Sequence, residues 1–236
     1  MTYVEGFLVA VPTANKQAFR QHAEKALPVF KDLGAKRMVE GWGDDVPRGE
    51  VNDLYGAVQA KDDETVLFSW MEYPDKATRD AANGKMMTDP RMADMAQMPF
   101  DGQRMVWSGF EGLLEKGPGG PAGYVDGVVL PVPADKKDAY REFADSAAAA
   151  FVENGATRVV EAWGDDLSVG KVTDFHRAVL REDDETVVFS WIEWPDKATR
   201  DAAWQNLMQD ERMSGPDRPF DGKRMIFGGF VPVVDG

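Results

Sequence analysis

The segment around position 176 carries residue types that could perform acid–base chemistry. Asp174 precedes His176 by two residues, and Arg177 follows it directly. If this segment is extended, the carboxylate and the imidazole lie on one face, and the carboxylate can then orient the imidazole as a general base. The alternative is a histidine that is solvated or packs against its neighbours. His176, Asp174 and Arg177 are therefore the catalytic candidates.

A second group of candidates comes from alternation along two strand-like segments. Glu161 and Trp163 are two residues apart, as are Trp191 and Glu193, so each pair lies on one face of its strand. Charges inside apolar strands are costly unless they are paired. The arginines that could pair with them are Arg37, Arg104, Arg158 and Arg224. Either these groups form structural ion pairs, or they line a cavity that recognises a polar small molecule. The second interpretation gives as ligand-binding residues Trp163, Glu161, Trp191, Glu193 and Arg224.

Paired aspartates follow two of the tryptophans, in the sequence WGDD at 42–45 and again at 163–166. Adjacent carboxylates could hold a divalent cation or share a proton. The alternative is a turn, because aspartate side chains after glycine accept backbone N–H bonds. The chain has two histidines and no cysteine, which excludes cysteine-ligated zinc, iron–sulfur clusters and disulfides and disfavours a histidine metal site. No metal and no cofactor are predicted.

All of these candidates fall within an internal repeat. Residues 3–114 align with residues 124–234 at an offset of 121, and about half of the aligned positions agree. The longest shared blocks are WGDD, DDETV, PDKATRDAA and PFDG-x-RM. The intervening KGPGGPAG is rich in glycine and proline and is typical of a flexible surface linker. The sequence therefore predicts a first repeat over 1–115, a linker over 116–123 and a second repeat over 124–236.

Each copy predicts the element order strand, helix, strand, strand, helix, strand. In the first copy the strands are expected over 4–11, 35–42, 65–73 and 104–114, and the first helix over 14–33, where apolar residues recur at steps of three and four. Asp75 is placed to cap the second helix. His22 lies on the apolar face of the first helix and aligns with Phe143, so it is predicted to pack. Residues 53–58 could form a short helix or an edge strand.

This order predicts an α+β fold in which two helices cover one face of each four-stranded antiparallel sheet. Both sides of the strand at 66–73 are apolar, so each sheet is expected to be buried on its other face as well. The sheet of the other repeat is the simplest cover, which gives a barrel with its helices outside. The chain is then a monomer that acts as an internal pseudo-dimer, and any ligand is expected between or within the two sheets.

Charge and hydropathy exclude several kinds of partner. Forty-one acidic and 27 basic residues give a net charge of −14, which repels phosphate backbones and anionic membrane surfaces, so no nucleic acid and no membrane partner are expected. The mean hydropathy is −0.41, and no apolar stretch approaches the length of a membrane span. No secretory signal is recognisable at the start of the sequence. A cytoplasmic location is the expectation.

The repeated motifs carry a resemblance to a known family. YV-[ED]-G near the start of each copy, WGDD, FSW-x-E-x-PDKATRD and MPFDG-x-RM make the chain similar to the YbaA family, small bacterial proteins without an established activity. The resemblance covers nearly the whole chain, twice, and implies two ferredoxin-like βαββαβ repeats packed as an intrachain dimeric α+β barrel. It supplies no catalytic residues. The wider superfamily includes cofactor-independent monooxygenases, isomerases and haem-degrading enzymes as well as proteins that only bind.

Two classes of function follow from these observations. The first is a small-molecule binding or interaction module in which the barrel is a stable container. The alternative is a cofactor-independent enzyme, an isomerase or monooxygenase-like protein that acts on a small organic substrate, with His176 as base and the tryptophans and carboxylates of the second repeat around it.

Overall fold

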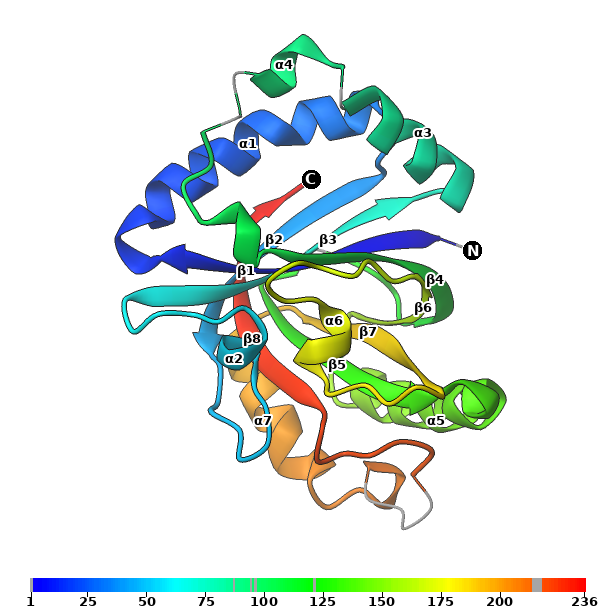
Figure 1. Cartoon of the computed structure of the whole chain (residues 1–236). Helices are drawn as coiled ribbons and strands as arrows, with labels where there is room; N and C mark the ends of the chain where they lie inside the picture. Colours follow the sequence, from blue (N-terminus) through cyan, green and yellow to red (C-terminus); the bar gives the residue numbers. More distant parts are fainter. Residues whose placement is uncertain (1, 87, 94, 96, 121, 214–217) are drawn as a thin grey trace.

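A computed structural model describes residues 2–86, 88–93, 95, 97–120, 122–213 and 218–236 of the chain (Figure 1). The strands of the first repeat are β1 (Tyr3–Pro12), β2 (Arg37–Asp45), β3 (Glu64–Tyr73) and β4 (Val106–Lys116). Those of the second are β5 (Tyr124–Pro133), β6 (Arg158–Asp166), β7 (Glu185–Trp194) and β8 (Ile226–Asp235). The helices are α1 (Lys16–Asp32), α2 (Leu54–Ala57), α3 (Lys76–Met86), α4 (Pro90–Ala93), α5 (Lys137–Glu153), α6 (Phe175–Ala178) and α7 (Lys197–Leu207).

The eight strands form one closed antiparallel barrel in the order β1-β3-β2-β8-β5-β7-β6-β4. Each repeat contributes four neighbouring strands, and the two seams between the repeats are the pairings of β2 with β8 and of β4 with β6. Closure leaves no unpaired strand edge. The predicted α+β barrel built from two βαββαβ repeats is therefore confirmed, with both seams hydrogen-bonded along their length.

Local sequence signals explain where the long helices begin and end. Asp75 and Asp196 accept the backbone N–H bonds of Thr78 and Thr199 at 2.7 Å, so each aspartate caps the helix that follows it. After α1 the chain turns at Gly34, whose φ of +114° is a conformation that side chains with a Cβ avoid. These boundaries agree with those expected from the capping pattern.

Three local expectations need correction or completion. The segment at 53–58 contains a short helix, α2, which Asp53 caps by accepting the Gly56 N–H at 2.6 Å. The WGDD blocks are not turns, because β2 and β6 continue through their second aspartates. The last strand of the first repeat begins at Val106 instead of residue 104, because Asp101 caps a turn of 3-10 helix over Gly102–Arg104.

The interior of the barrel is filled by side chains from both repeats. Phe68 and Phe189 stack with ring centroids 4.3 Å apart, and Trp70 and Trp191 stack at 4.5 Å. Gly6 permits this packing, because a Cβ there would lie 2.8 Å from the Phe189 ring. The stacked rings are fully buried, so they occupy the place between the sheets where a ligand was expected.

One end of the barrel is closed by a buried cluster of two arginines and two glutamates. Arg37 donates to Glu193 at 2.8 Å, and Arg158 donates to Glu72 at 2.7 Å, so each arginine pairs with the glutamate of the other repeat. The indoles of Trp70 and Trp191 donate to the same glutamates. Arg104 pairs separately with Glu64, and Arg224 with Glu185, both at 2.6 Å. All four arginines thus form structural ion pairs, one of the two alternatives that the sequence left open.

The two most strongly repeated motifs meet across the repeats. Lys76 and Arg79 of the first PDKATR block pair with Asp165 and Asp166 of the second WGDD block, at 2.5 and 2.6 Å. The reciprocal pairs, at 2.9 and 2.8 Å, are those of Lys197 with Asp44 and Arg200 with Asp45. The aspartates are thus used as ion-pair partners. Among the described residues no group of three or more histidine, aspartate or glutamate side chains is placed to hold a metal ion.

The helices lie outside the barrel, α1 and α3 on one side and α5 and α7 on the opposite side (Figure 1). Helix α1 packs on β2 and β8, and α5 packs on β4 and β6, so each long helix covers one seam between the repeats. No helix within the described ranges is long and apolar enough to cross a membrane. A cavity lies in the layer between α1 and the sheet of the first repeat.

Candidate functional site

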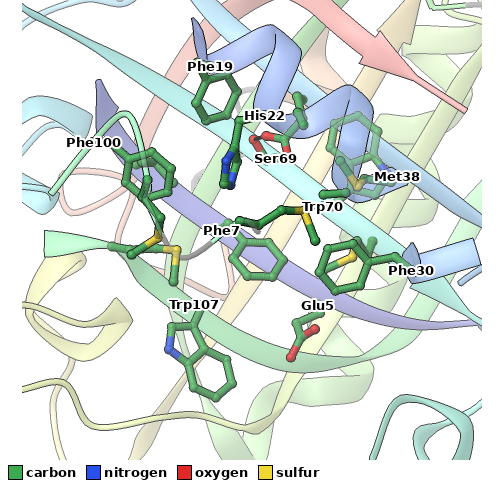
Figure 2. A pocket seen from close by; sticks show the side chains of 18 of the residues that line it. Glu5, Phe7, Phe19, His22, Phe30, Met38, Ser69, Trp70, Phe100 and Trp107 are labelled. Atoms are coloured by element: carbon green, nitrogen blue, oxygen red, sulfur yellow. Dashed lines mark hydrogen bonds between the residues drawn. The ribbon is translucent and has the colours of Figure 1, made fainter. Parts of the chain in front are cut away.

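A cavity of about 450 Å³ lies between the outer face of the first repeat's sheet and the helix layer above it (Figure 2). Helix α1 contributes Phe19, His22 and Phe30 to its wall. In Figure 2, Phe7 lies near the centre of the view, with His22 on one side of it and Trp107 and Glu5 on the other. The cavity is therefore outside the barrel, between a sheet and a helix, and not between the two sheets.

The floor of the cavity is one row of neighbouring residues across four strands. Glu40 on β2 is the direct cross-strand partner of Ser69 on β3, Ser69 is the partner of Phe7 on β1, and Phe7 is the partner of Trp107 on β4. Because alternate residues of a strand point to opposite faces, this register places all four side chains on the outer face of the sheet. The row gives the site one carboxyl, one hydroxyl and two aromatic rings.

Glu40 is the acidic residue of this row. Ser69 Oγ donates a short hydrogen bond to Glu40 Oε2, and no ion pair to Glu40 is found among the described residues. Burial disfavours the charged carboxylate and raises the pKa of Glu40 to about 7, against the smaller opposing effect of the Ser69 hydrogen bond. A carboxyl with this pKa is present in both protonation states near neutral pH, so it can accept or donate a proton.

A second carboxyl, Glu5 of β1, faces the same cavity. Asn83 Nδ2 donates to Glu5 Oε1 at 3.0 Å, and Arg79 approaches Glu5 within 3.7 Å. Burial raises the pKa of Glu5 from its ordinary value, partly offset by the Asn83 hydrogen bond and the Arg79 charge. Glu5 therefore differs from Glu40 in having a cationic neighbour.

His22 lies on α1 and lines the cavity beside Phe100, with the two ring centroids 6.4 Å apart and the planes nearly perpendicular. Burial lowers the pKa of His22, helped by the charge of Lys25, so the neutral imidazole is favoured. The packing role predicted for this histidine agrees with the ring contact. Its place in the cavity wall adds a polar group that the sequence interpretation did not anticipate.

Thioethers and aromatic rings form most of the remaining wall. Methionine is unbranched and polarisable, so a wall built from it adapts to ligands of different shape. The methionines that line the cavity are Met38, Met71, Met86, Met92, Met95, Met98 and Met105. Trp107 and Met98 are also partly exposed at the surface, 39% and 43%. The site is therefore an apolar container with a few polar groups, which is the usual composition of a small-molecule pocket.

The second repeat keeps the same polar pair but covers it. Glu161 and Ser190 are cross-strand partners as Glu40 and Ser69 are, and burial likewise raises the pKa of Glu161 to about 7. Here, however, the hydroxyl of Tyr140 on α5 donates to Glu161 Oε2 at 2.7 Å. Tyr140 is 3% exposed and aligns with Phe19, which has no such hydroxyl.

Larger side chains occupy the rest of the equivalent space. Phe143 stands where the first repeat has His22, and its ring packs 5.4 Å from that of Phe220. Trp204 stands where the first repeat has Asn83, and its indole donates to Asp126 at 3.0 Å. The two repeats have thus diverged: where the first has Phe19, His22 and Asn83, the second has Tyr140, Phe143 and Trp204.

The ligand-binding candidates from the sequence do not converge on one site. Glu161 and Trp163 lie on the outer face of β6 beneath α5, where Tyr140 packs on Trp163 with centroids 6.1 Å apart. Trp191 and Glu193 point to the inside of the barrel and belong to the buried ion cluster. Arg224 lies apart from both, paired with Glu185 and Asp221.

The three catalytic candidates are close in space but do not form the expected dyad. The segment is helical, not extended, because Asp174 caps α6 by accepting the Arg177 N–H at 2.9 Å. The same carboxylate also pairs with the Arg177 guanidinium at 2.7 Å. His176 Nδ1 is buried and has no hydrogen-bond partner among the described groups. The helical turn thus directs Asp174 to its own backbone and away from the imidazole.

The catalytic and ligand-binding candidates predicted from the sequence lie in the second repeat, whereas the cavity belongs to the first. One signal in the sequence distinguishes the repeats: of the 12 methionines, only Met208, Met213 and Met225 fall after the linker. A second signal is the aligned pair Phe19 and Tyr140. Tyr140 has a hydroxyl that can hydrogen-bond to the glutamate of its repeat, and Phe19 has none. Ser69 could have been found as the cross-strand neighbour of Glu40 once the strand register was known.

Comparison with known proteins agrees with the duplication. The family model described as "Protein of unknown function (DUF1428)" matches residues 2–102 and again 123–222. The chain belongs to this family. The uncharacterized protein YbaA of Escherichia coli (strain K12) is 55% identical over 117 residues, which are 49% of this chain and all of that protein. This member of DUF1428 is therefore a tandem duplication of a YbaA-like unit, as the repeated motifs predicted.

Solved structures similar to this DUF1428 chain share its fold at low identity. A putative monooxygenase from Fusobacterium nucleatum has a TM-score of 0.62 and 11% identity, covering 99% of this chain and 93% of that one. A putative monooxygenase from Lactobacillus acidophilus has a TM-score of 0.59 and 10% identity, covering 100% and 95%. At these identities the likeness shows the dimeric α+β barrel fold alone.

Proposed function

We propose that this chain binds a small, uncharged organic molecule that contains a ring, in the cavity of the first repeat. The observation that carries this proposal is the cavity itself, about 450 Å³ of apolar and aromatic wall over a row that holds one carboxyl and one hydroxyl. Sites for drug-sized molecules are typically of this size and composition. The sequence predicts a ligand between or within the two sheets, whereas this proposal puts the ligand in the cavity outside the barrel.

Charge defines the class of ligand. The titratable side chains among the described residues of the lining are Glu5, His22 and Glu40, and none of these lining residues is a lysine or an arginine. The carboxylates of Glu5 and Glu40 repel an anion, and the neutral form of His22 offers it no positive charge, whereas a neutral ring with one hydroxyl or carbonyl group can hydrogen-bond to Glu40, Ser69 or His22. We therefore expect phenols and cyclic ketones to bind and carboxylic acids of the same size to be rejected.

The test uses three probes of similar size: 2-naphthol, 2-tetralone and 2-naphthoate. Calorimetry and saturation-transfer NMR should detect binding of the first two and not of the third. Asn83→Trp copies the residue that fills the second repeat and should weaken binding at least about tenfold, a change of about 1.4 kcal/mol. His176→Ala is the control for the other candidate site and should bind as the parent protein does. Equal binding of the anion, or full binding by Asn83→Trp, would contradict the proposal.

The proposal also covers the boundaries of the two repeats and the oligomeric state of the chain. We take residues 1–115 and 124–236 as the two repeats and 116–123 as the linker, and we propose that the chain is a monomer because both seams of its barrel are paired internally. Light scattering should give a mass near 26.1 kDa at all concentrations, and a stable mass of twice that value would contradict it. The cytoplasmic location stays a prediction.

The alternative function, a cofactor-independent enzyme, is favoured by one observation, namely the carboxyl of Glu40 at the cavity floor. His176 is the base expected from the sequence, but Asp174 is engaged by Arg177 and does not orient the imidazole. The proposal therefore puts proton transfer at Glu40.

A further inference from the structure

Glu40 and Glu161 differ in the number of donors that the protein offers to the carboxyl. Glu161 accepts from two, the Tyr140 hydroxyl and Ser190. Glu40 accepts from Ser69 through Oε2, and its Oε1 has no hydrogen-bond partner among the described residues. Glu40 lines the cavity. An unpartnered carboxylate oxygen beside a ligand-sized space is the geometry of a group that acts on the ligand.

We propose that Glu40 is a catalytic base that transfers a proton on a neutral, ring-containing carbonyl compound bound in the cavity of the first repeat. This inference rests on the binding proposed above and adds a reaction and a substrate class. The substrate must carry a C–H bond next to its carbonyl, because only such a proton is acidic enough for a carboxylate to remove in an apolar site.

The reaction needs no co-reactant. Glu40 takes the proton, so the C–H bond breaks, its electron pair forms a C=C bond, and the carbonyl π electrons move to oxygen to give an enolate. The protonated Glu40 then returns the proton to the same carbon, which exchanges it, or to the far carbon of a conjugated enolate, which shifts the double bond. Either return restores the carboxylate and the neutral product, so atoms and electrons balance.

The neighbours of Glu40 suit each part of this step. Ser69 holds Oε2 and so orients the carboxyl, which leaves Oε1 available to the substrate. His22 on α1 favours its neutral form and so keeps one N–H donor for the developing enolate oxygen. Among the described lining residues, Glu5 on β1 is the remaining titratable group; α3, β3, β4 and the described part of 92–105 contribute none. The aromatic and methionine walls exclude water from the base.

The test measures hydrogen exchange on a defined probe. 2-Tetralone in D₂O loses its C1 proton signal in ¹H NMR as deuterium enters, and the protein-free rate is subtracted. The parent protein should accelerate this loss, and the rate should rise with pH through a midpoint near 7, where the Glu40 carboxylate forms. Glu40→Gln should reduce the accelerated rate at least about 100-fold, while saturation-transfer NMR still shows the probe bound.

Glu161→Gln is the matched control, because it makes the same change at the covered carboxyl of the second repeat. It should retain both the exchange rate and the midpoint of the parent protein. Three results would overturn the inference: binding without accelerated exchange, equal rates for Glu40→Gln and the parent, or equal losses in the two variants. Absence of 2-tetralone binding to the parent protein would overturn the binding proposal as well, so the two failures are distinguishable.

Discussion

The Tyr140 hydroxyl donates a 2.7 Å hydrogen bond to Glu161, a carboxyl whose counterpart in the first repeat, Glu40, lies open to a cavity beneath Phe19. The two aromatic residues differ by one oxygen atom. That oxygen gives Glu161 a donor that Glu40 lacks, although the sheet, the serine partner and the strand register are the same in both repeats.

Exchanging these two aromatic residues should have opposite effects. Tyr140→Phe removes one of the two donors to the buried Glu161 and should cost about 1–3 kcal/mol of unfolding free energy, with more of the loss at pH 8, where the carboxylate is charged. Phe19→Tyr gives Glu40 a new donor and should leave stability equal or higher while weakening 2-tetralone binding. Urea unfolding and calorimetry measure the two effects. Equal destabilisation by both changes would contradict the assignment of the open and covered sites.

The first repeat should also tolerate a larger side chain where the cavity leaves space for it. Ala26 of α1 lines it, whereas the equivalent residue, Ala147 of α5, packs in a filled core. Ala147→Leu should cost about 1–3 kcal/mol, the usual cost of overpacking. Ala26→Leu has space to enter and should leave stability nearly unchanged or raise it. Urea unfolding of the two variants side by side checks this, and the idea fails if the order of their stabilities is reversed.

Stability should fall as pH rises from about 4.5 to about 7, in part because of Glu161. Burial raises the pKa of this group to about 7 from its ordinary value of 4.5, so within that window the unfolded chain releases the proton and the folded chain retains it. The stabilisation is complete below the unfolded pKa and is lost as pH passes the folded pKa, for a change of about 3 kcal/mol.

Glu161→Gln isolates that contribution, because His22, Glu5 and Glu40 still titrate in both proteins. Urea unfolding at pH 4.5, 5.5 and 7 should show the parent losing more stability than the variant across the window. Parallel curves for the two proteins would mean that Glu161 is charged when folded.

Arg79 should be far more important to stability than an exposed arginine. It is 3% exposed, it pairs with Asp166 across the repeats at 2.6 Å, and it is the cation nearest to the buried Glu5. Arg79→Ala should therefore cost about 3–5 kcal/mol. The control is Arg20→Ala, whose pair with Glu24 is solvent-exposed and is worth less than about 1 kcal/mol. Similar losses from the two substitutions in urea would refute the role given to Arg79.

The fold could be predicted because its signals are strong and occur twice. The helical spacing of apolar residues in α1, the capping aspartate of α3 and the two-sided apolar pattern of β3 each appear again in the second repeat, and two half-covered sheets of this kind have few other ways to bury their faces. The helical turn at α6 was harder to predict, because Asp174 can serve as a cap or as a neighbour of His176, and its distance to the Arg177 N–H decides between them.

The site could be predicted only in part. Both faces of β7 are buried, so its apolar pattern could not show that Trp191 points inward while Glu161 of the adjacent strand points outward. The cavity itself depends on the summed volumes of side chains from several elements, and this is not encoded in any one spacing. The alternation along the strand places the carboxyl of Glu40 on one face of the sheet. Whether that carboxyl is exposed to a cavity depends on the side chains that pack over this face.

Joining both halves of the barrel in one polypeptide has an evolutionary consequence. In an assembly of two identical chains, a codon change alters both subunits together, so neither can lose a pocket while the other keeps it. Here Phe19 and Tyr140 are encoded separately, and selection can act on each without the other. The second repeat can then serve as a scaffold, while substitutions in the methionine-lined cavity of the first repeat can change what it binds.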